Sequence, residues 1–121
     1  MVVSRCRHRR LKYFKIPSNG FRSKSWSEFV APHAPRLDFV LTVCDKAAGE
    51  SCPTWPGQPI TAHWGVFDPS TVRGDADLRA KAFIEVAVTL RRRIQLMLAL
   101  PIENLDALSM RRNLRDIGRE E

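Results

Sequence analysis

Apolar residues gather in two short continuous runs in the first half of the chain. The run at 37–44, LDFVLTVC, is rich in β-branched and apolar residues, which is typical of a strand covered on both faces in a parallel sheet. The run at 60–66, ITAHWGV, predicts a second short strand. Upstream of both, the segment 23–30 (SKSWSEFV) predicts a short helix capped by Ser25 or Ser27.

The second half of the chain changes to helical spacing. From about residue 77 to residue 100, apolar side chains recur at steps of three and four, which predicts a long amphipathic helix ended by Pro101. Asp75 and Asp77 lie at its positive N-terminal end, where carboxylates are favoured. We expect its apolar face to hold Phe83, Ala87, Leu90, Ile94 and Met97 or Leu98.

A second amphipathic segment follows at about 104–117, and Gly118 is in the position of a C-terminal cap. We expect its buried face to hold Leu105, Leu108, Leu114 and Ile117. Two strands and two helices indicate an α/β fold with a parallel sheet flanked by helices. Two strands are too few for a stable parallel sheet, so this pattern predicts the C-terminal part of a single domain over residues 13–119.

Charge separates the N-terminal segment from the rest of the chain. The net charge is +7, and residues 1–15 hold six of the 20 lysines and arginines but no acid, which leaves 14 basic against 13 acidic residues elsewhere. We expect residues 1–12 to be a basic, disordered, solvated tail and not a nucleic-acid or membrane-binding segment. Because the chain shows neither a signal peptide nor an apolar run of membrane-spanning length, we expect a soluble, cytoplasmic protein.

Three cysteines without an export signal argue against a secreted disulfide framework. Seven residues separate Cys44 from Cys52, and the small ones among them make a reversible disulfide geometrically easy. The alternative interpretation is that Cys44 is a buried thiol at the end of a strand and that Cys52 is incidental. Zinc is a weaker interpretation, because C-x7-C is an unusual ligand spacing that only His63 or the Cys6/His8 pair could complete.

Three further features have a functional and a structural interpretation. Asp68 precedes Pro69 in an exposed turn, where it could serve as a general acid, although Asp-Pro is also a common way to open a turn. His63, on a short apolar strand, favours a satisfied core position over a metal-ligand role. Residues 91–93, three consecutive arginines, spread over about 200° of helix surface, which indicates a solvated face and not a flat binding patch.

Taken together, the segments FRSKSWSEF, LDFVLTVCDKAAGESCPTWPGQPITAHWGVFDPS and LRRRIQLMLALPIENLDALSMRRNLRDIG resemble the arsenate reductases built on the low-molecular-weight tyrosine phosphatase fold. The resemblance runs from about residue 13 to residue 118. It includes, in the family's order, the two-cysteine loop, Trp-Pro-Gly, His-Trp-Gly and Asp-Pro. It implies reduction of arsenate to arsenite for arsenical resistance, with no bound cofactor or metal.

The resemblance implies catalytic roles for Cys44, Cys52 and Asp68. In the family, a first cysteine in a C-x5-R loop attacks arsenate, and an acid matching Asp68 helps to expel oxygen as water. The cysteine matching Cys44 then releases arsenite, and the one matching Cys52 resolves the disulfide into a Cys44–Cys52 bridge. An external thiol reductant, such as thioredoxin, glutaredoxin or a low-molecular-weight thiol, reduces that bridge.

The chain departs from the family where the first strand, the C-x5-R loop, the first helix and the second strand should be. Cys6 does not replace the loop cysteine, because Lys12 stands where the arginine is needed. We therefore expect an N-terminally truncated chain, with an alternative or misassigned start, that is catalytically incomplete alone. The absent first strand predicts a bare edge at 37–44 and poor solubility. Two alternatives stay open: a non-catalytic thiol-redox module, or a phosphotyrosine phosphatase relative, which would not need both downstream cysteines.

Overall fold

The computed structural model describes residues 15, 17, 19, 24–43 and 55–119. In chain order its elements are the 3-10 helix η1 (Trp26–Phe29), the strands β1 (Phe39–Thr42) and β2 (Ile60–His63), the 3-10 helix η2 (Pro69–Thr71), the helix α3 (Ala76–Leu98), the 3-10 helix η3 (Ile102–Asn104) and the helix α4 (Ala107–Arg119). Ser25 caps η1 by accepting a hydrogen bond from the Ser27 amide, as the sequence predicts. In the described ranges, no helix is both long and apolar enough to cross a membrane.

The two strands form a parallel pair, which confirms a mixed α/β structure. Phe39 is paired with Ile60 and Thr42 with His63. Just outside the strands, the Ile60 amide donates to the Asp38 carbonyl at 2.9 Å, and the Trp64 amide donates to the Thr42 carbonyl at 2.7 Å. Within the described residues, β1 pairs with β2 alone and its other side is an edge, in agreement with the expected edge at 37–44.

The bounds of α3 lie within about two residues of those that the sequence pattern predicts, whereas α4 begins at residue 107 and not at about 104. Asp75 caps α3, because its side chain accepts a hydrogen bond from the Leu78 amide at 2.8 Å. In α4, the Asp106 carboxylate plays the same part by accepting from the Ser109 amide at 2.7 Å. Each cap satisfies a backbone donor that has no partner inside its helix.

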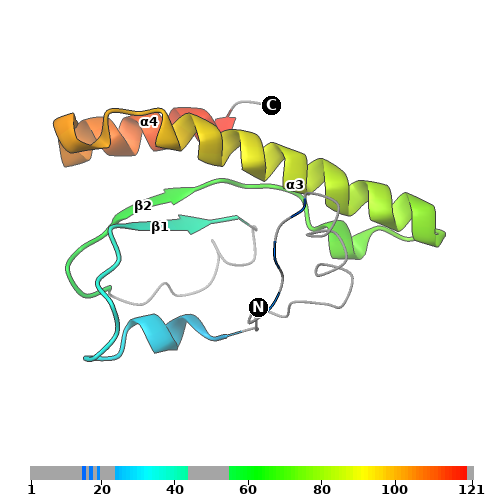
Figure 1. Cartoon of the computed structure of the whole chain (residues 1–121), viewed down its shortest axis with the longest axis horizontal. Coiled ribbons are helices and arrows are strands. Elements are labelled where there is room, and N and C mark those ends of the chain that lie inside the picture. Colours follow the sequence, from blue (N-terminus) through cyan, green and yellow to red (C-terminus); the bar gives the residue numbers. More distant parts are fainter. Residues whose placement is uncertain (1–14, 16, 18, 20–23, 44–54, 120–121) are drawn as a thin grey trace.

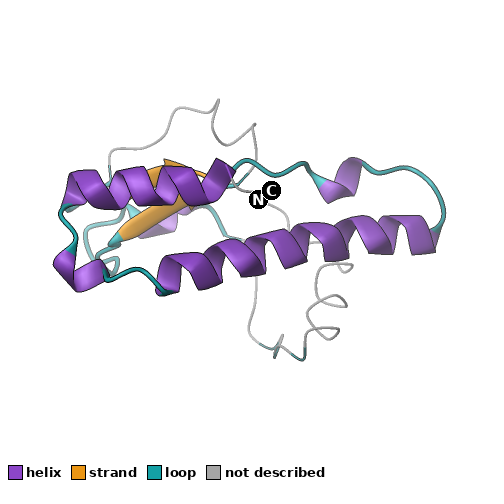
Figure 2. Cartoon of the chain, turned by 90° about the horizontal axis from the view of Figure 1, so that it is seen from above, coloured by secondary structure: helices purple, strands orange, loops and turns teal. Residues whose placement is uncertain are grey.

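One face of the sheet is covered by helix, and the core lies there. Figure 1 shows α3 and α4 on one side of the strands and η1 on the other, and in Figure 2 α4 lies over the strands. The buried side chains of this core are Trp64, Met110, Leu114 and Ile117. Half-buried side chains from both strands, including Phe39, Leu41, Ile60 and Ala62, pack against them. The Trp64 indole also donates a hydrogen bond of 2.8 Å to the Leu114 carbonyl.

The opposite face of the sheet is more exposed to solvent than expected for strands covered on both faces. Along β2, Ile60 and Ala62 are half-buried, whereas Thr61 and His63 are exposed. This alternation is typical of a strand with one covered face. The expectation that His63 belongs to the core is therefore wrong, because its side chain points away from the helices.

The helices bury some side chains other than those predicted. Leu98 is 69% exposed, Leu108 is 68% exposed and Ile94 is 48% exposed. Met110 takes the place of Leu108, because Met110, Leu114 and Ile117 follow the spacing of a single helix face. Arg93 is only 7% exposed, so the three consecutive arginines do not form a uniformly solvated face.

Gly118 does not cap α4, because the helix continues through it to Arg119. Gly118 instead permits a close approach between α4 and the end of β2. A Cβ atom at this position would lie 2.7 Å from Cδ1 of Trp64 and 3.1 Å from the His63 carbonyl oxygen. The glycine thus lets α4 pack directly onto the end of β2.

Candidate functional site

The carboxyl ends of β1 and β2 form the candidate site. Both strands run in the same direction, so the loops that follow them leave from the same edge of the sheet. Beyond the strands, the Val66 amide donates to the Val43 carbonyl at 2.9 Å and keeps the two chains together. In open α/β sheets this edge is where ligands and catalytic groups gather.

Thr42 and His63 meet at this edge. They are register partners, and Thr42 Oγ1 lies 2.7 Å from His63 Nδ1, within hydrogen-bonding distance. The contact holds the imidazole ring in one orientation at an exposed position. The sequence analysis singled out His63 but not Thr42. Only the register of the two strands identifies the threonine as its partner, and a sequence pattern does not contain that register.

Asp68 lies five residues beyond His63 and caps η2. Its carboxylate accepts hydrogen bonds from the Ser70 amide at 2.9 Å and from the Ser70 hydroxyl at 2.6 Å. The side chain is half-buried, and the Thr71 hydroxyl donates to the Asp68 carbonyl at 2.7 Å. This is the turn that an Asp-Pro pair favours. It holds the carboxylate in a defined place on the segment that follows β2.

Arg93 reaches the same edge from α3. One of its terminal nitrogens, Nη1, donates a long hydrogen bond of 3.4 Å to the Gly65 carbonyl. The arginine thereby ties α3 to the chain between His63 and Asp68. A run of three arginines gave no signal for this role, because the sequence alone does not show which of the three faces the sheet.

Cys44 and Cys52, with Cys6, lie outside the described residues. Val43, directly before Cys44, and Trp55, three residues after Cys52, are described, and Trp55 is buried. Among described side chains, no group of three histidine, cysteine, aspartate or glutamate residues could hold a metal ion. The candidate site therefore consists of Thr42 and His63 at the strand edge, with Asp68 on the segment that follows β2 and Arg93 bonded to Gly65 of that segment.

Comparisons with known proteins do not identify a relative. No model of a known protein family matches the sequence, and no curated protein matches it.

Proposed function

We propose that this chain is the C-terminal part of an arsenate reductase of the low-molecular-weight tyrosine phosphatase type. In this proposal Cys44 and Cys52 are its redox pair and Asp68 is its general acid. The chain acts in the thiol-relay half of the reaction, and a thioredoxin-like protein or another thiol supplies the electrons. The proposal rests on the ordered motifs of residues 42–69.

One structural observation supports the proposal more than any other. The strand that precedes Cys44 and the strand that precedes Asp68 are parallel neighbours, with Thr42 directly opposite His63. The two segments that carry the proposed chemistry therefore start from one edge of one sheet.

The proposed relay consists of two thiolate attacks. The first forms a disulfide and the second exchanges it. A cysteine of the C-x5-R type carries arsenic(V) on its sulfur, and the Cys44 thiolate attacks that sulfur. The sulfur–arsenic bond breaks, and its electron pair leaves with arsenic as arsenite, so arsenic gains two electrons. The Cys52 thiolate then attacks the Cys44 sulfur, and the first cysteine leaves as a thiolate. Two electrons from the external thiol reopen the Cys44–Cys52 bridge.

The 121 residues contain no C-x5-R sequence, so this chain does not hold the arsenate-binding loop. Its own residues would supply the general acid of the first step and the two cysteines of the later steps. Asp68, anchored by Ser70, would give a proton to an oxygen that leaves arsenic as water. We therefore expect the isolated chain to show no arsenate turnover but to retain a reducible Cys44–Cys52 bridge.

The test is to oxidise the purified chain mildly and count its remaining thiols. We expect wild type to lose two of its three thiols and to recover both with thioredoxin, its reductase and NADPH. Peptide mapping should assign the bridge to Cys44 and Cys52. Arsenate added to the reduced chain should produce no arsenite.

The control variant is Cys6→Ser, which should form the same bridge and recover both thiols. In Cys44→Ser or Cys52→Ser, the intramolecular bridge should be lost. Bridging of Cys6 instead, or a Cys44–Cys52 bridge that thioredoxin does not reduce, would contradict the proposal. Arsenite formation by the chain alone would show that our account of the missing first step is wrong.

A further inference from the structure

The helix α4 has one apolar face and one basic face. Its three buried side chains pack against the sheet and belong to the core described above. Four of its arginines are exposed: Arg111, Arg112, Arg115 and Arg119. At about 100° of turn per residue, these arginines lie within about 100° of one another, on the side of the helix away from the buried side chains. In Figure 2, which looks down on α4, no described element lies over the helix.

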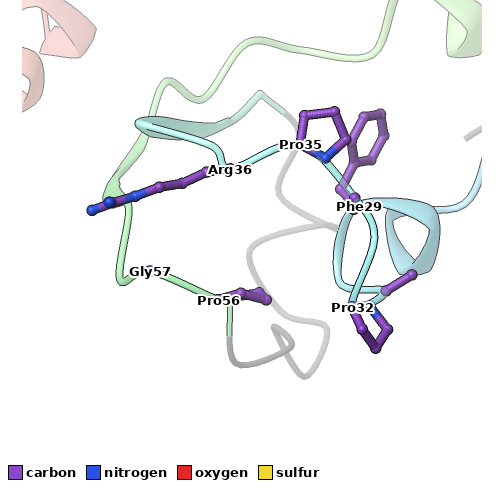
Figure 3. A pocket seen from close by; sticks show the side chains of 8 residues that line it. Phe29, Pro32, Pro35, Arg36, Pro56 and Gly57 are labelled. Atoms are coloured by element: carbon purple, nitrogen blue, oxygen red, sulfur yellow. The ribbon is translucent and has the colours of Figure 1, made fainter.

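Two other arginines have a use inside the structure. Arg93 is buried and donates to the Gly65 carbonyl. Arg36 lies beside a small cavity of about 220 Å³ formed by the loops before the two strands, and its guanidinium extends toward Gly57, away from the phenyl and proline walls (Figure 3). A Cβ atom on Gly57 would lie only 2.9 Å from Arg36 Nε. In contrast, no hydrogen bond within the described part of the chain involves the four guanidinium groups of α4.

Most acidic residues near this helix lie at its two ends. Asp106 precedes the helix and accepts a hydrogen bond from the Ser109 amide at 2.7 Å, with Arg112 near it. Glu120 and Glu121 follow the helix and lie outside the described residues. Within α4 itself, Asp116 is the one acidic residue among four arginines. The body of the helix therefore carries a net positive charge.

The arginines form a line of charge along the helix. Arg111, Arg115 and Arg119 follow one another at intervals of four residues, a spacing at which like charges oppose helix formation. With Arg112, four charges occupy about 12 Å of the helix axis, at a mean interval of about 4 Å. One strand of a DNA duplex carries one phosphate per about 3.4 Å of axis. The two charge densities are similar, and a bound strand of phosphates would relieve the repulsion.

We propose that this arginine face of α4 binds the phosphate backbone of double-stranded nucleic acid without reading its sequence. Guanidinium groups pair with phosphate oxygens through two parallel hydrogen bonds, and such contacts carry no sequence information. An anionic membrane fits this face less well. The apolar side of α4 is buried in the core, and Leu108 is the one large apolar side chain that the helix exposes.

The probe is a short DNA duplex of mixed sequence, titrated with the whole chain over a series of salt concentrations and followed by fluorescence anisotropy. We expect a Kd of about 10⁻⁶–10⁻⁴ M at physiological salt, and the same Kd for a duplex of scrambled sequence. The logarithm of the binding constant should fall linearly with the logarithm of the salt concentration, by about 0.9 for each phosphate contacted.

The test variant replaces Arg111, Arg115 and Arg119 together by glutamine. Its salt dependence should be less steep by about 2.7, because three phosphate contacts are lost, and its binding at low salt should be at least about tenfold weaker. Glutamine is about as good a helix former as arginine, so α4 should be kept, which circular dichroism and urea denaturation check.

The matched control removes three charges from the basic N-terminal segment, in the variant Arg7→Gln/Arg9→Gln/Arg10→Gln. Because we expect that segment to be solvated, the control should change the salt dependence by less than about 1. A salt dependence that the α4 variant leaves unchanged, or that the control lowers by as much, would overturn the proposal.

Polyglutamate is the second probe, and it should bind more weakly than the duplex. Equally tight binding of polyglutamate would assign the arginine face to an acidic protein and overturn the choice of nucleic acid. Because all titrations use reduced protein and no readout involves a cysteine, the result is independent of the proposed redox function.

Discussion

Single side chains determine how the covering helix lies on the strands. Trp64 is 1% exposed, and its indole both fills the core and binds the Leu114 carbonyl. Gly118 leaves the space that the indole ring occupies. The two residues make one contact, in which the large side chain directly after β2 packs where α4 has no side chain.

Gly118→Ala should destabilise the chain, although alanine is the better helix former by about 1 kcal/mol. The added Cβ would lie 2.7 Å from the indole, and relieving that overlap should give a net loss of about 1–3 kcal/mol. Urea denaturation measures the change. In the Trp64→Leu background the same substitution should cost much less, because the crowding atom is gone. A net gain in stability in the wild-type background would contradict the close contact.

Arg93→Ala should also destabilise the chain, by about 2–3 kcal/mol, because the substitution removes a buried stem and the hydrogen bond to Gly65. Arg93→Met should lose less, because methionine refills most of the space and needs no hydrogen-bond acceptor. Arg91→Ala is the control, since that neighbouring arginine is exposed and should change stability by under about 0.5 kcal/mol. Equal losses at Arg91 and Arg93 would argue against the buried position of Arg93.

At the scale of elements, the sequence predicts where the helices lie better than it predicts which helix face is buried. Spacing of apolar residues, Asp75 and Pro101 define α3 to within about two residues. The buried face of α4 is less predictable, because Leu108 and Met110 are both apolar and only contact with Trp64 and the strands selects Met110. His63 was expected in the core because the run around it is apolar, yet strand alternation turns it outward. The cavity beside Arg36 has no sequence signal, since distant loops form it.

The start of α4 should respond to acid. The Ser109 amide and hydroxyl donate to Asp106, with Arg112 nearby, and these contacts hold the Asp106 pKa below its ordinary value of 3.8. A carboxylate whose folded pKa lies below its unfolded pKa stabilises the fold above the unfolded value. That stabilisation is lost as the pH falls through the folded pKa. We expect the urea midpoint of wild type to fall below about pH 4 in part for this reason.

The matched variant for this effect is Asp106→Asn. Asparagine accepts the same hydrogen bond from the Ser109 amide but has no carboxylate to protonate. Its urea midpoint should therefore fall less steeply than that of wild type over the same acid range. Parallel pH profiles for the two proteins would show that the Asp106 carboxylate does not contribute to the acid response.

At the scale of the whole molecule, the sheet is the exposed part of the structure. Within the described residues β1 has one paired side, and α3 and α4 both lie on one face of the sheet. Thr61 and His63 of β2 are exposed. The strand FVLT contains neither charge nor proline, the two features that usually protect an edge. Such an edge favours pairing with another chain.

We expect the purified chain to self-associate with increasing concentration, and Val40→Lys to reduce that association. A charge on the open face of an edge strand opposes pairing with a second strand. Sedimentation velocity over a concentration series measures the effect. Val88→Lys adds the same charge at an exposed position on α3 and should leave association unchanged. A sharp, cooperative melt of a monomeric wild-type chain would contradict the expectation.

The packing of Trp64 against α4 also sets the order in which the protein can fold during its synthesis. Three of the four buried side chains of this core belong to α4, and the indole of Trp64 donates to the carbonyl of Leu114, 50 residues further along the chain. The ribosome delivers both strands and all of α3 before α4 leaves the exit tunnel. Until then the inner face of the sheet lacks the side chains of α4, and apolar surface that they cover stays exposed on the nascent chain. The emergence of α4 completes this core.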